Sequence, residues 1–312
     1  MKKMEKQADE VAQRGINVVV AVPCQSDVKA YFCYDLAQMM AYTATRYSVP
    51  GVIDNMALAM QVGTYVHTAR MALAAAAMQQ EMDYVLFLDS DMRFPPDTLA
   101  RLLARNLPMV GCNYVSRKYP VRYIGVEKVA DPESEEKGTL LTTARDSTGV
   151  EECDALGFGV MLIRRDVFEA LPDPREQPWW WYEWMPKHNS QIGEDVYFCR
   201  LVREAGVPIH VDHDLSKQIK HLGDEQFSLE HVWAQDKLQQ QLKEVEDAAS
   251  DDVRDPPDGG AGDPKPVGRS DSGGGAGVDP EGGAEAAEGH EGETPSGPES
   301  ILSLVGGDSP SE

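Results

Sequence analysis

Two carboxylates, Asp89 and Asp91, directly follow the apolar run 84–88 and are the residues most able to do chemistry. Such a run is typical of a buried strand, which would deliver both side chains at its carboxyl end. Carboxylates two residues apart can share Mg²⁺ or Mn²⁺, and these ions keep coordination positions open for the phosphates of a substrate. The same spacing also occurs in turns that cap a following helix. We favour the metal site, because a buried strand rarely ends in two carboxylates without a charge to neutralise.

A second acidic pair and one histidine extend this hypothesis. Glu194 and Asp195 stand at the start of a predicted helix, 194–205, where acidic side chains interact favourably with the helix dipole. One of them could instead accept the proton of a hydroxyl group as a general base. His221 could be either a structural histidine or a metal ligand. Each residue has an ordinary structural explanation, so the functional one requires the fold to bring them together.

The segment 179–184 holds four of the five tryptophans of the chain, together with Tyr182. Three prolines within 172–178 precede it, so we predict a loop rather than a helix or strand. Loops are seldom buried, and aromatic faces stack on sugars and on nucleobases. We therefore interpret Trp180, Trp181 and Tyr182 as a lid or platform beside a binding site.

Strand-like and helix-like segments alternate along the first 243 residues and would position these side chains. Continuous apolar runs predict strands at 16–23, 84–88, 109–115, 157–163 and 209–212. Helical spacing and helix-start signals predict helices at 34–47, at 64–81, after Pro95-Pro96-Asp97, at 165–170 and at 194–205. This alternation predicts an α/β fold with a mostly parallel, Rossmann-like sheet flanked by helices. The site should then lie at the carboxyl ends of the strands.

The negative charge of the chain is concentrated in its C-terminal part. Residues 244–312 hold 18 acidic and 3 basic side chains, so they carry −15 of the formal net charge of −23. This segment is rich in Gly, Pro and Ser and poor in apolar residues, which predicts a disordered acidic tail. The remaining boundaries are an N-terminal extension at 1–15 and one domain at 16–243.

Composition disfavours several classes of protein. The acidic balance excludes a chain-wide basic patch for non-specific nucleic-acid binding. Five scattered Cys without a CxxC pair disfavour a zinc ribbon and a secreted disulfide framework. The sequence contains no recognisable signal peptide and no apolar run long enough to cross a bilayer. We therefore expect a cytoplasmic protein, in the host cytoplasm if a virus encodes it, with no membrane partner and no obligate protein partner.

Over about residues 16–223 the chain resembles nucleotide-sugar-dependent glycosyltransferases of the GT-A fold, and in particular their compact phage-encoded members. The parts that carry the resemblance occur in the same order, at 19–32, at Arg70, at the Asp89–Asp91 pair, and at 114–118, 157–168, 193–198 and 221–223. In the family Asn usually follows the helical Arg, whereas Met71 follows Arg70 here, so only the Arg is carried over. The resemblance implies a GT-A fold and transfer of a sugar from a nucleotide sugar to a hydroxyl group.

The resemblance also implies roles on the donor side of the site. The donor would be contacted by Pro23, Gln25, Arg70, Asp89, Ser90 and Lys118. Arg70 and Lys118 would add positive charge to the diphosphate, with Arg117 as a competitor of Lys118. Asp89, Asp91 and His221 would hold Mn²⁺ or Mg²⁺. A UDP-sugar is the default donor, because UDP is the commonest nucleotide in the fold.

On the acceptor side, the resemblance implies Asp195 as general base, with Glu194 as its competitor; in retaining members of the fold an acid at this place positions the substrate instead. It also implies that the acceptor contacts Gly157, Trp180, Trp181 and Tyr182. Phage enzymes of this type glycosylate hydroxymethylated pyrimidines, so the favoured acceptor is 5-hydroxymethylcytosine in double-stranded DNA. A glycan or a protein acceptor is the alternative. A non-catalytic carbohydrate- or DNA-binding protein with a transferase fold is an alternative of another class. A nucleotidyltransferase should show a Gly-rich loop after its first strand, and residues 23–27 contain no Gly.

Overall fold

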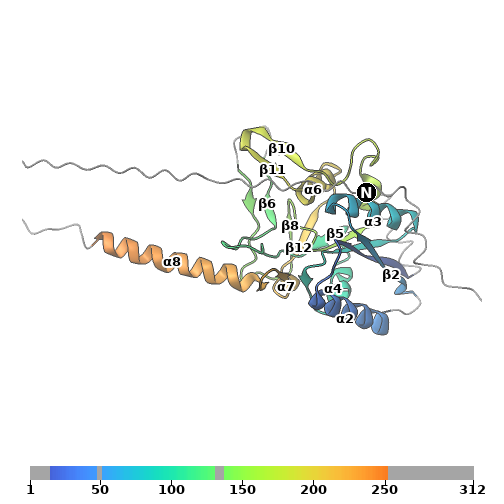
Figure 1. Ribbon diagram of the computed structural model, residues 1–312, viewed down its shortest axis with the longest axis horizontal. Helices are drawn as coiled ribbons and strands as arrows, with labels where there is room; N and C mark the ends of the chain where they lie inside the picture. Colours follow the sequence, from blue (N-terminus) through green and yellow to red (C-terminus); the bar gives the residue numbers. More distant parts are fainter. Residues whose placement is uncertain (1–14, 48–50, 131–136, 252–312) are drawn as a thin grey trace, which may run out of the picture. The chain divides into compact units, whose positions relative to one another are not determined.

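The computed structural model describes residues 15–47, 51–130 and 137–251 (Figure 1). The predicted N-terminal extension before Gly15 and the predicted tail beyond Asp251 therefore lie outside the described residues. Helix α8 (Leu229–Asp251) crosses the boundary that we predicted after residue 243. None of the helices in the described residues is both long enough and apolar enough to span a membrane.

A sheet of seven strands forms the centre of the described part of the chain (Figure 1). In spatial order the strands are β2 (Ile53–Val62), β1 (Ile16–Cys24), β3 (Tyr84–Leu88), β9 (Val160–Arg164), β5 (Met109–Gly111), β12 (Ile209–Asp212) and β8 (Val150–Cys153). β1 is parallel to β2 and β3, and β12 is parallel to β5. β9 is antiparallel to β3 and β5, and β8 is antiparallel to β12. Five strands therefore share one direction, which confirms the predicted α/β fold with a mostly parallel sheet and is consistent with a Rossmann-like GT-A architecture.

Helices flank this sheet because the first strand is apolar towards both of its faces. The flanking helices are α2 (Ala30–Tyr47), α3 (Val66–Gln79), α4 (Thr98–Ala104), α5 (Arg165–Ala170) and α6 (Glu194–Glu204). Val18, Val20 and Val22 of β1 join a core cluster with α2 and α4. Val19 and Ala21 join a second cluster with α3, α5 and α6. Successive side chains of a strand point to opposite faces, so an unbroken apolar strand needs cover on both.

Short strands outside the main sheet bring distant segments together. They are β4 (Met92–Arg93), β6 (Val126–Lys128), β7 (Thr139–Leu140), β10 (Glu183–Met185), β11 (Ser190–Ile192), β13 (Lys220–Leu222) and β14 (Gln226–Phe227), and the short helices are η1 (Pro186–His188) and α7 (His213–Ser216). β13 pairs with β4 so that His221 lies opposite Met92. The Leu222 N–H also donates to the Asp91 carbonyl oxygen at 2.7 Å. This pairing places His221 beside the predicted carboxylate pair.

Besides these short elements, two strands of the main sheet and the last helix lie outside the predicted segments. β2 is an edge strand with a polar start, Asp54-Asn55, and its apolar residues at 56–60 are Met, Ala and Leu, which favour helices over strands. β8 is another edge strand, and its two glutamates are exposed. In α8, Leu229 and Val232 are buried, whereas much of the remaining length is polar and exposed. The first turns of this helix therefore pack against the core, whereas Leu238 and Leu242 farther along it are exposed.

Candidate active site

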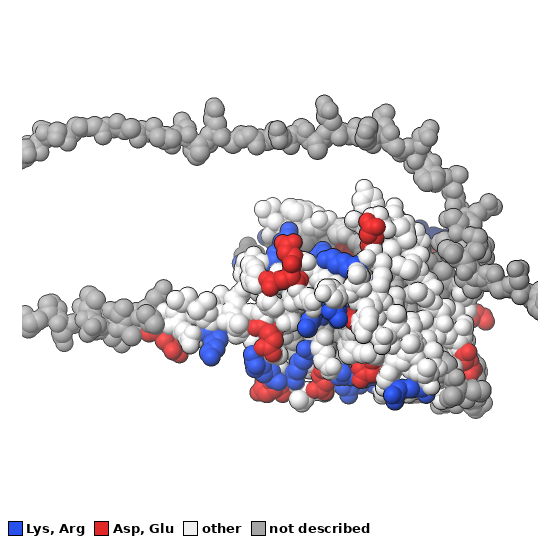
Figure 2. Space-filling view, turned by 60° about the horizontal axis from the view of Figure 1, so that its bottom comes forward, with Lys and Arg blue, Asp and Glu red and all other residues white. Residues whose placement is uncertain are grey.

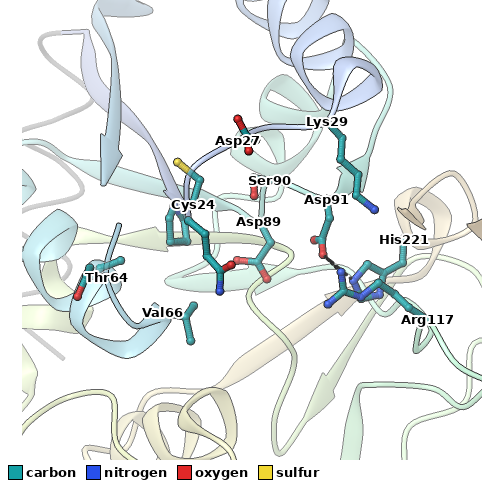
Figure 3. A pocket seen from close by; sticks show the side chains of 13 residues that line it. Cys24, Asp27, Lys29, Thr64, Val66, Asp89, Ser90, Asp91, Arg117 and His221 are labelled. Carbon is teal, nitrogen blue, oxygen red and sulfur yellow. Dashed lines mark hydrogen bonds and ion pairs between the residues drawn. The ribbon is translucent and has the colours of Figure 1, made fainter. Parts of the chain in front are cut away.

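A cavity of about 480 Å³ opens at the carboxyl ends of β1 and β3 (Figure 3). It is lined by Pro23, Cys24, Gln25, Asp27, Lys29, Thr64, Val66, Ala69, Asp89, Ser90, Asp91, Arg117 and His221. This is the edge of the sheet at which parallel α/β folds bind ligands. Its volume is in the range of small-molecule sites. We call this cavity the donor pocket.

Asp91 lies at the cationic end of the donor pocket. Its Oδ2 atom accepts a hydrogen bond from Arg117 Nη1 at 2.5 Å and lies 3.4 Å from His221 Nε2. Figure 3 shows Asp91 directed toward these two side chains, with Lys29 nearby. Although burial raises it, the pKa of Asp91 is below its ordinary value because His221, Arg117 and Lys29 stabilise the carboxylate. Asp91 is therefore ionised at neutral pH and faces a concentration of positive charge.

Asp91 and His221 fit a metal site as two of its ligands. The Nδ1 atom of His221 lies 2.8 Å from the carbonyl oxygen of Val115, which can only accept, so Nδ1 carries the hydrogen. In the neutral ring Nε2 then presents its lone pair toward Asp91. Asp91 Oδ2 and His221 Nε2 are then two hydrogen-bond acceptors, which repel each other unless a proton or a cation lies between them. Second-sphere hydrogen bonding to a backbone carbonyl is also how ligating histidines are commonly held.

The third predicted metal ligand, Asp89, is directed elsewhere. Arg70 Nη2 donates to both of its oxygens, at 3.0 and 3.2 Å. Within the described residues, no group of three or more His, Cys, Asp and Glu side chains is arranged to hold a metal ion. Asp89 thus lines the pocket but is engaged by Arg70, and metal binding by Asp89, Asp91 and His221 stays a prediction.

Arg70 is the centre of a cluster of three carboxylates. Its side chain is 2% exposed, and Nη1 donates to Glu194 Oε1 at 2.7 Å and to Asp195 Oδ1. Its guanidinium also lies over the Phe158 ring, 4.9 Å from the centroid. Burial lowers the pKa of Arg70, but Asp195, Asp89 and Glu194 more than compensate and raise it, so the group is always charged. We predicted that Arg70 contacts the donor diphosphate; it lies beneath the pocket and neutralises these acids instead.

Asp195 has an unusual protonation equilibrium. Its Oδ2 atom accepts a hydrogen bond from the Phe158 N–H at 3.3 Å, and its side chain keeps 23% exposure. Burial raises the pKa of Asp195 to about 7, with Arg70 opposing the shift and Glu194 and Asp89 adding to it. A carboxyl group with a pKa near neutrality can accept a proton in one step and release it in the next. Arg70, which donates to both carboxylates, thus links the predicted base Asp195 to Asp89.

Gly157, predicted on the acceptor side, is buried, and its role is a packing one. A Cβ atom on this residue would lie 2.2 Å from the Tyr114 hydroxyl oxygen, and a Cβ on Gly159 would lie 2.7 Å from Tyr114 Cζ. The Gly159 N–H also donates to the Tyr114 hydroxyl at 3.1 Å. Both glycines therefore make room for Tyr114, which supports the site from below. The prediction that Gly157 contacts an acceptor is corrected accordingly.

The other predicted donor residues are placed in part as expected. Pro23, Gln25 and Ser90 line the donor pocket, as does Asp89. Lys118 is exposed and is not among the lining residues, whereas its competitor Arg117 is. Lys29 was missed, although its position five residues after the end of the first strand is a usable signal. Its Nζ donates to the Leu222 carbonyl oxygen at 2.5 Å, which ties the first loop to the His221 strand.

The aromatic segment divides into a buried half and an exposed half. Trp180 is fully buried and stacks on Phe198, with the ring centroids 4.3 Å apart. It cannot contact an acceptor, so that prediction is wrong; the segment packs into the core because Phe87, Phe158 and Phe168 surround this ring. Trp181 and Tyr182 are exposed.

Replacing Trp180 with Ala should reduce stability rather than substrate binding. Removing a buried Trp leaves a cavity in the core and costs about 3–5 kcal/mol of unfolding free energy. Urea unfolding followed by circular dichroism measures the change. Trp184→Ala is the control, because Trp184 is 56% exposed and should shift the unfolding free energy by no more than about 0.5 kcal/mol. Equal stability of the two variants would contradict the buried position of Trp180.

Comparison with known proteins finds only distant similarity. No protein-family model matches the sequence, and no curated protein matches it. Similar solved structures include A197 from STIV, with 15% identity, a TM-score of 0.41 and coverage of 67% of this chain and 86% of that chain. They also include a glycosyltransferase involved in the glycosylation of the major capsid of PBCV-1, with 13% identity, a TM-score of 0.26 and coverage of 52% and 69%. Likenesses at this level do not identify a function, which must come from the residues of the site.

Proposed function

We propose that this protein is a metal-dependent glycosyltransferase that moves a sugar from a nucleoside-diphosphate sugar to a hydroxyl acceptor. The proposal rests on one observation: a pocket with cationic side chains and a carboxyl group with a raised pKa lie together at one edge of the sheet. The donor pocket gathers Arg117, Lys29 and the Asp91–His221 pair. Asp195, with its raised pKa, is joined to Asp89 of that pocket through Arg70.

The donor pocket suits a nucleoside diphosphate. Arg117 and Lys29 supply positive charge for the phosphates, and guanidinium groups bind phosphate oxygens in a bidentate manner. Asp91 and His221 would hold a divalent cation, Mn²⁺ or Mg²⁺, which when bound neutralises charge on the leaving diphosphate as a Lewis acid. Gln25 and Ser90 offer hydrogen-bonding groups to the nucleoside and the sugar. A UDP-sugar remains the default donor.

The reaction needs one proton acceptor. The bond between the anomeric carbon and the diphosphate oxygen breaks, and the nucleoside diphosphate leaves with the electron pair. The acceptor oxygen forms the new bond to the anomeric carbon, and its proton passes to the Asp195 carboxylate. Arg70 holds Asp195 in place, and Glu194, on the same guanidinium, is the competing base.

The test is nucleoside-diphosphate release from a panel of nucleotide sugars with Mn²⁺ present. Each donor is offered with no acceptor, with unmodified DNA, with 5-hydroxymethylcytosine DNA and with neutral oligosaccharides. These arms cover the DNA acceptor favoured by the sequence and the glycan alternative. We expect release from one donor class. No release from any donor would move the assignment to a non-catalytic binding protein.

Replacing Asp91 with Asn should remove the anionic metal ligand. We expect nucleoside-diphosphate release to fall at least about 100-fold, because metal stabilisation of the leaving group is worth several kcal/mol and each 1.36 kcal/mol is tenfold in rate. Asp224→Asn is the matched control: Asp224 lies three residues from His221, is exposed and does not line the donor pocket. Equal rates in the two variants, at any Mn²⁺ concentration, would contradict the metal role of Asp91.

A further inference from the structure

A second cavity, of about 760 Å³, adjoins the donor pocket. The two share Gln25, Thr64 and Val66 in their walls. The second cavity adds Tyr65, from the loop between β2 and α3, and Tyr182, from the aromatic segment. A molecule bound here would therefore lie beside a donor bound in the donor pocket.

Two of these lining residues belong to a group of four aromatic rings in mutual contact, which we call the aromatic platform: Tyr65, His67, Trp181 and Tyr182. The His67 ring stacks on Tyr65, with centroids 5.7 Å apart and an interplanar angle of 16°. The same ring meets Trp181 at 5.9 Å and Tyr182 at 5.5 Å, both edge to face. His67 thus joins two chain segments more than 100 residues apart into one arrangement.

The platform presents large apolar rings to solvent. Tyr65 is 78% exposed and Trp181 is 51% exposed. Contiguous exposed aromatic surface is uncommon in soluble proteins and marks binding sites. A second sign is His67 Nδ1, which is buried and has no hydrogen-bond partner in the described residues. Buried polar atoms normally have partners, so an unpaired one among the platform rings indicates room for a water or a ligand group there.

The platform leads directly to the catalytic acids. Tyr182 lies close to Glu194, and burial together with the Glu194 charge raises the pKa of Tyr182 to about 12. Glu194 shares the Arg70 guanidinium with Asp195. An acceptor bound on the platform would consequently have one end close to Asp195, the proposed base.

The walls of the second cavity contain no Lys, Arg, Asp or Glu among the described residues that line it. DNA binding draws much of its affinity from Lys and Arg contacts to phosphates, so a DNA path should be lined by cations. Over the face shown in Figure 2, basic and acidic side chains of the described residues are interspersed and form no continuous basic patch. Rings combined with neutral amide and hydroxyl groups, here Gln25, Ser26 and Thr64, suit an uncharged ligand that carries hydroxyl groups.

We propose that the acceptor is an uncharged glycan whose sugar ring stacks on the aromatic platform, rather than DNA. This inference rests on the proposed function for the identity of the donor pocket. The apolar C–H face of the sugar ring contacts Trp181 and Tyr65, and its hydroxyls reach Gln25 and Thr64. One hydroxyl is then presented to Asp195.

The test measures binding without requiring turnover. Full-length protein is titrated with neutral oligosaccharides of several linkages, and with double-stranded DNA with and without 5-hydroxymethylcytosine, at physiological salt. We expect at least one oligosaccharide class to bind and Trp181→Ala to weaken its affinity about tenfold, a loss of about 1.4 kcal/mol. Trp184→Ala should leave affinity unchanged, because Trp184 is similarly exposed but makes none of the ring contacts of the platform.

The outcomes separate this inference from the proposed function. Donor turnover with transfer to 5-hydroxymethylcytosine DNA, or with no glycan bound, would overturn the glycan acceptor and keep the transferase. Glycan binding that depends on Trp181, with no release from any nucleotide sugar, would keep the carbohydrate site and overturn the transferase. Equal effects of the Trp181 and Trp184 variants would overturn the platform as the binding surface.

Discussion

An Arg70→Met variant is expected to lose about 3–5 kcal/mol of unfolding free energy, the largest stability effect of any single charge in the site. Arg70 is the shared partner of Asp89, Glu194 and Asp195, which come from two distant parts of the chain. Removing one partner of a buried ion pair leaves uncompensated charge, which is more costly than losing the pair. Native proteins have unfolding free energies of about 5–15 kcal/mol. A protein at the lower end of this range would be almost completely unfolded by such a loss.

Urea unfolding at pH 8 measures this loss, with Arg117→Met as the matched control. Arg117 also donates to a site carboxylate, Asp91, but its side chain is 48% exposed, so its removal should cost no more than about 1 kcal/mol. Adding Asp195→Asn to Arg70→Met should recover part of the stability, because one of the three unneutralised acids is gone. Equal midpoints for Arg70→Met and Arg117→Met, or no recovery in the double variant, would show that the acids do not need Arg70.

The strand that delivers Asp89 and Asp91 was predictable because it is apolar on both faces and short, and β3 has the predicted limits. The hydrogen-bond partners of the two carboxylates were not predictable from the sequence. Arg70 and Asp195 are 125 residues apart, and the packing of α3 against the sheet decides that the guanidinium faces Asp89 rather than a phosphate. A resemblance in sequence order identifies the residues of a site, but it does not say which atoms they touch.

The aromatic residues illustrate a second limit. Trp180 and Trp181 are neighbours of identical type, yet one is fully buried and the other half exposed. Outside regular structure no fixed period assigns successive side chains to the core or to solvent. Tyr65 and His67 were missed for a different reason: they lie at the start of the helix predicted at 64–81, and nothing in that segment indicates contact with residues more than 100 positions away.

The reaction rate of the wild-type protein should rise with pH up to about 7 and then level off. A general base works in its unprotonated form, and the Asp195 carboxyl group has its pKa raised to about 7. Below that pH each unit should cost up to tenfold in rate, because the unprotonated fraction falls by that factor. The measurement is kcat/KM for nucleoside-diphosphate formation between pH 5 and 9, with an acceptor present, because kcat/KM reports the pKa values of the free enzyme. A flat profile would contradict Asp195 as the base.

Asp195→Asn should lower kcat by about 100- to 10 000-fold and abolish the acid limb of the profile, since the amide cannot accept the proton. Glu194→Gln is the matched control, because Glu194 hydrogen bonds to the same Arg70 nitrogen. A larger loss in Glu194→Gln than in Asp195→Asn would assign the base to Glu194.

The same substitution should not destabilise the fold, which separates catalysis from structure. The folded-state pKa of Asp195 is raised from 3.8 to about 7, so the native state holds this proton more tightly than the unfolded state does. The contribution of Asp195 to stability is therefore most favourable at low pH and is lost as pH rises toward 7. At pH 8 the ionised group is a net cost that Asn does not carry, and Asp195→Asn should unfold at an equal or higher urea concentration than wild type. A protein that keeps a destabilising carboxylate at this point has traded stability for a base poised near neutrality.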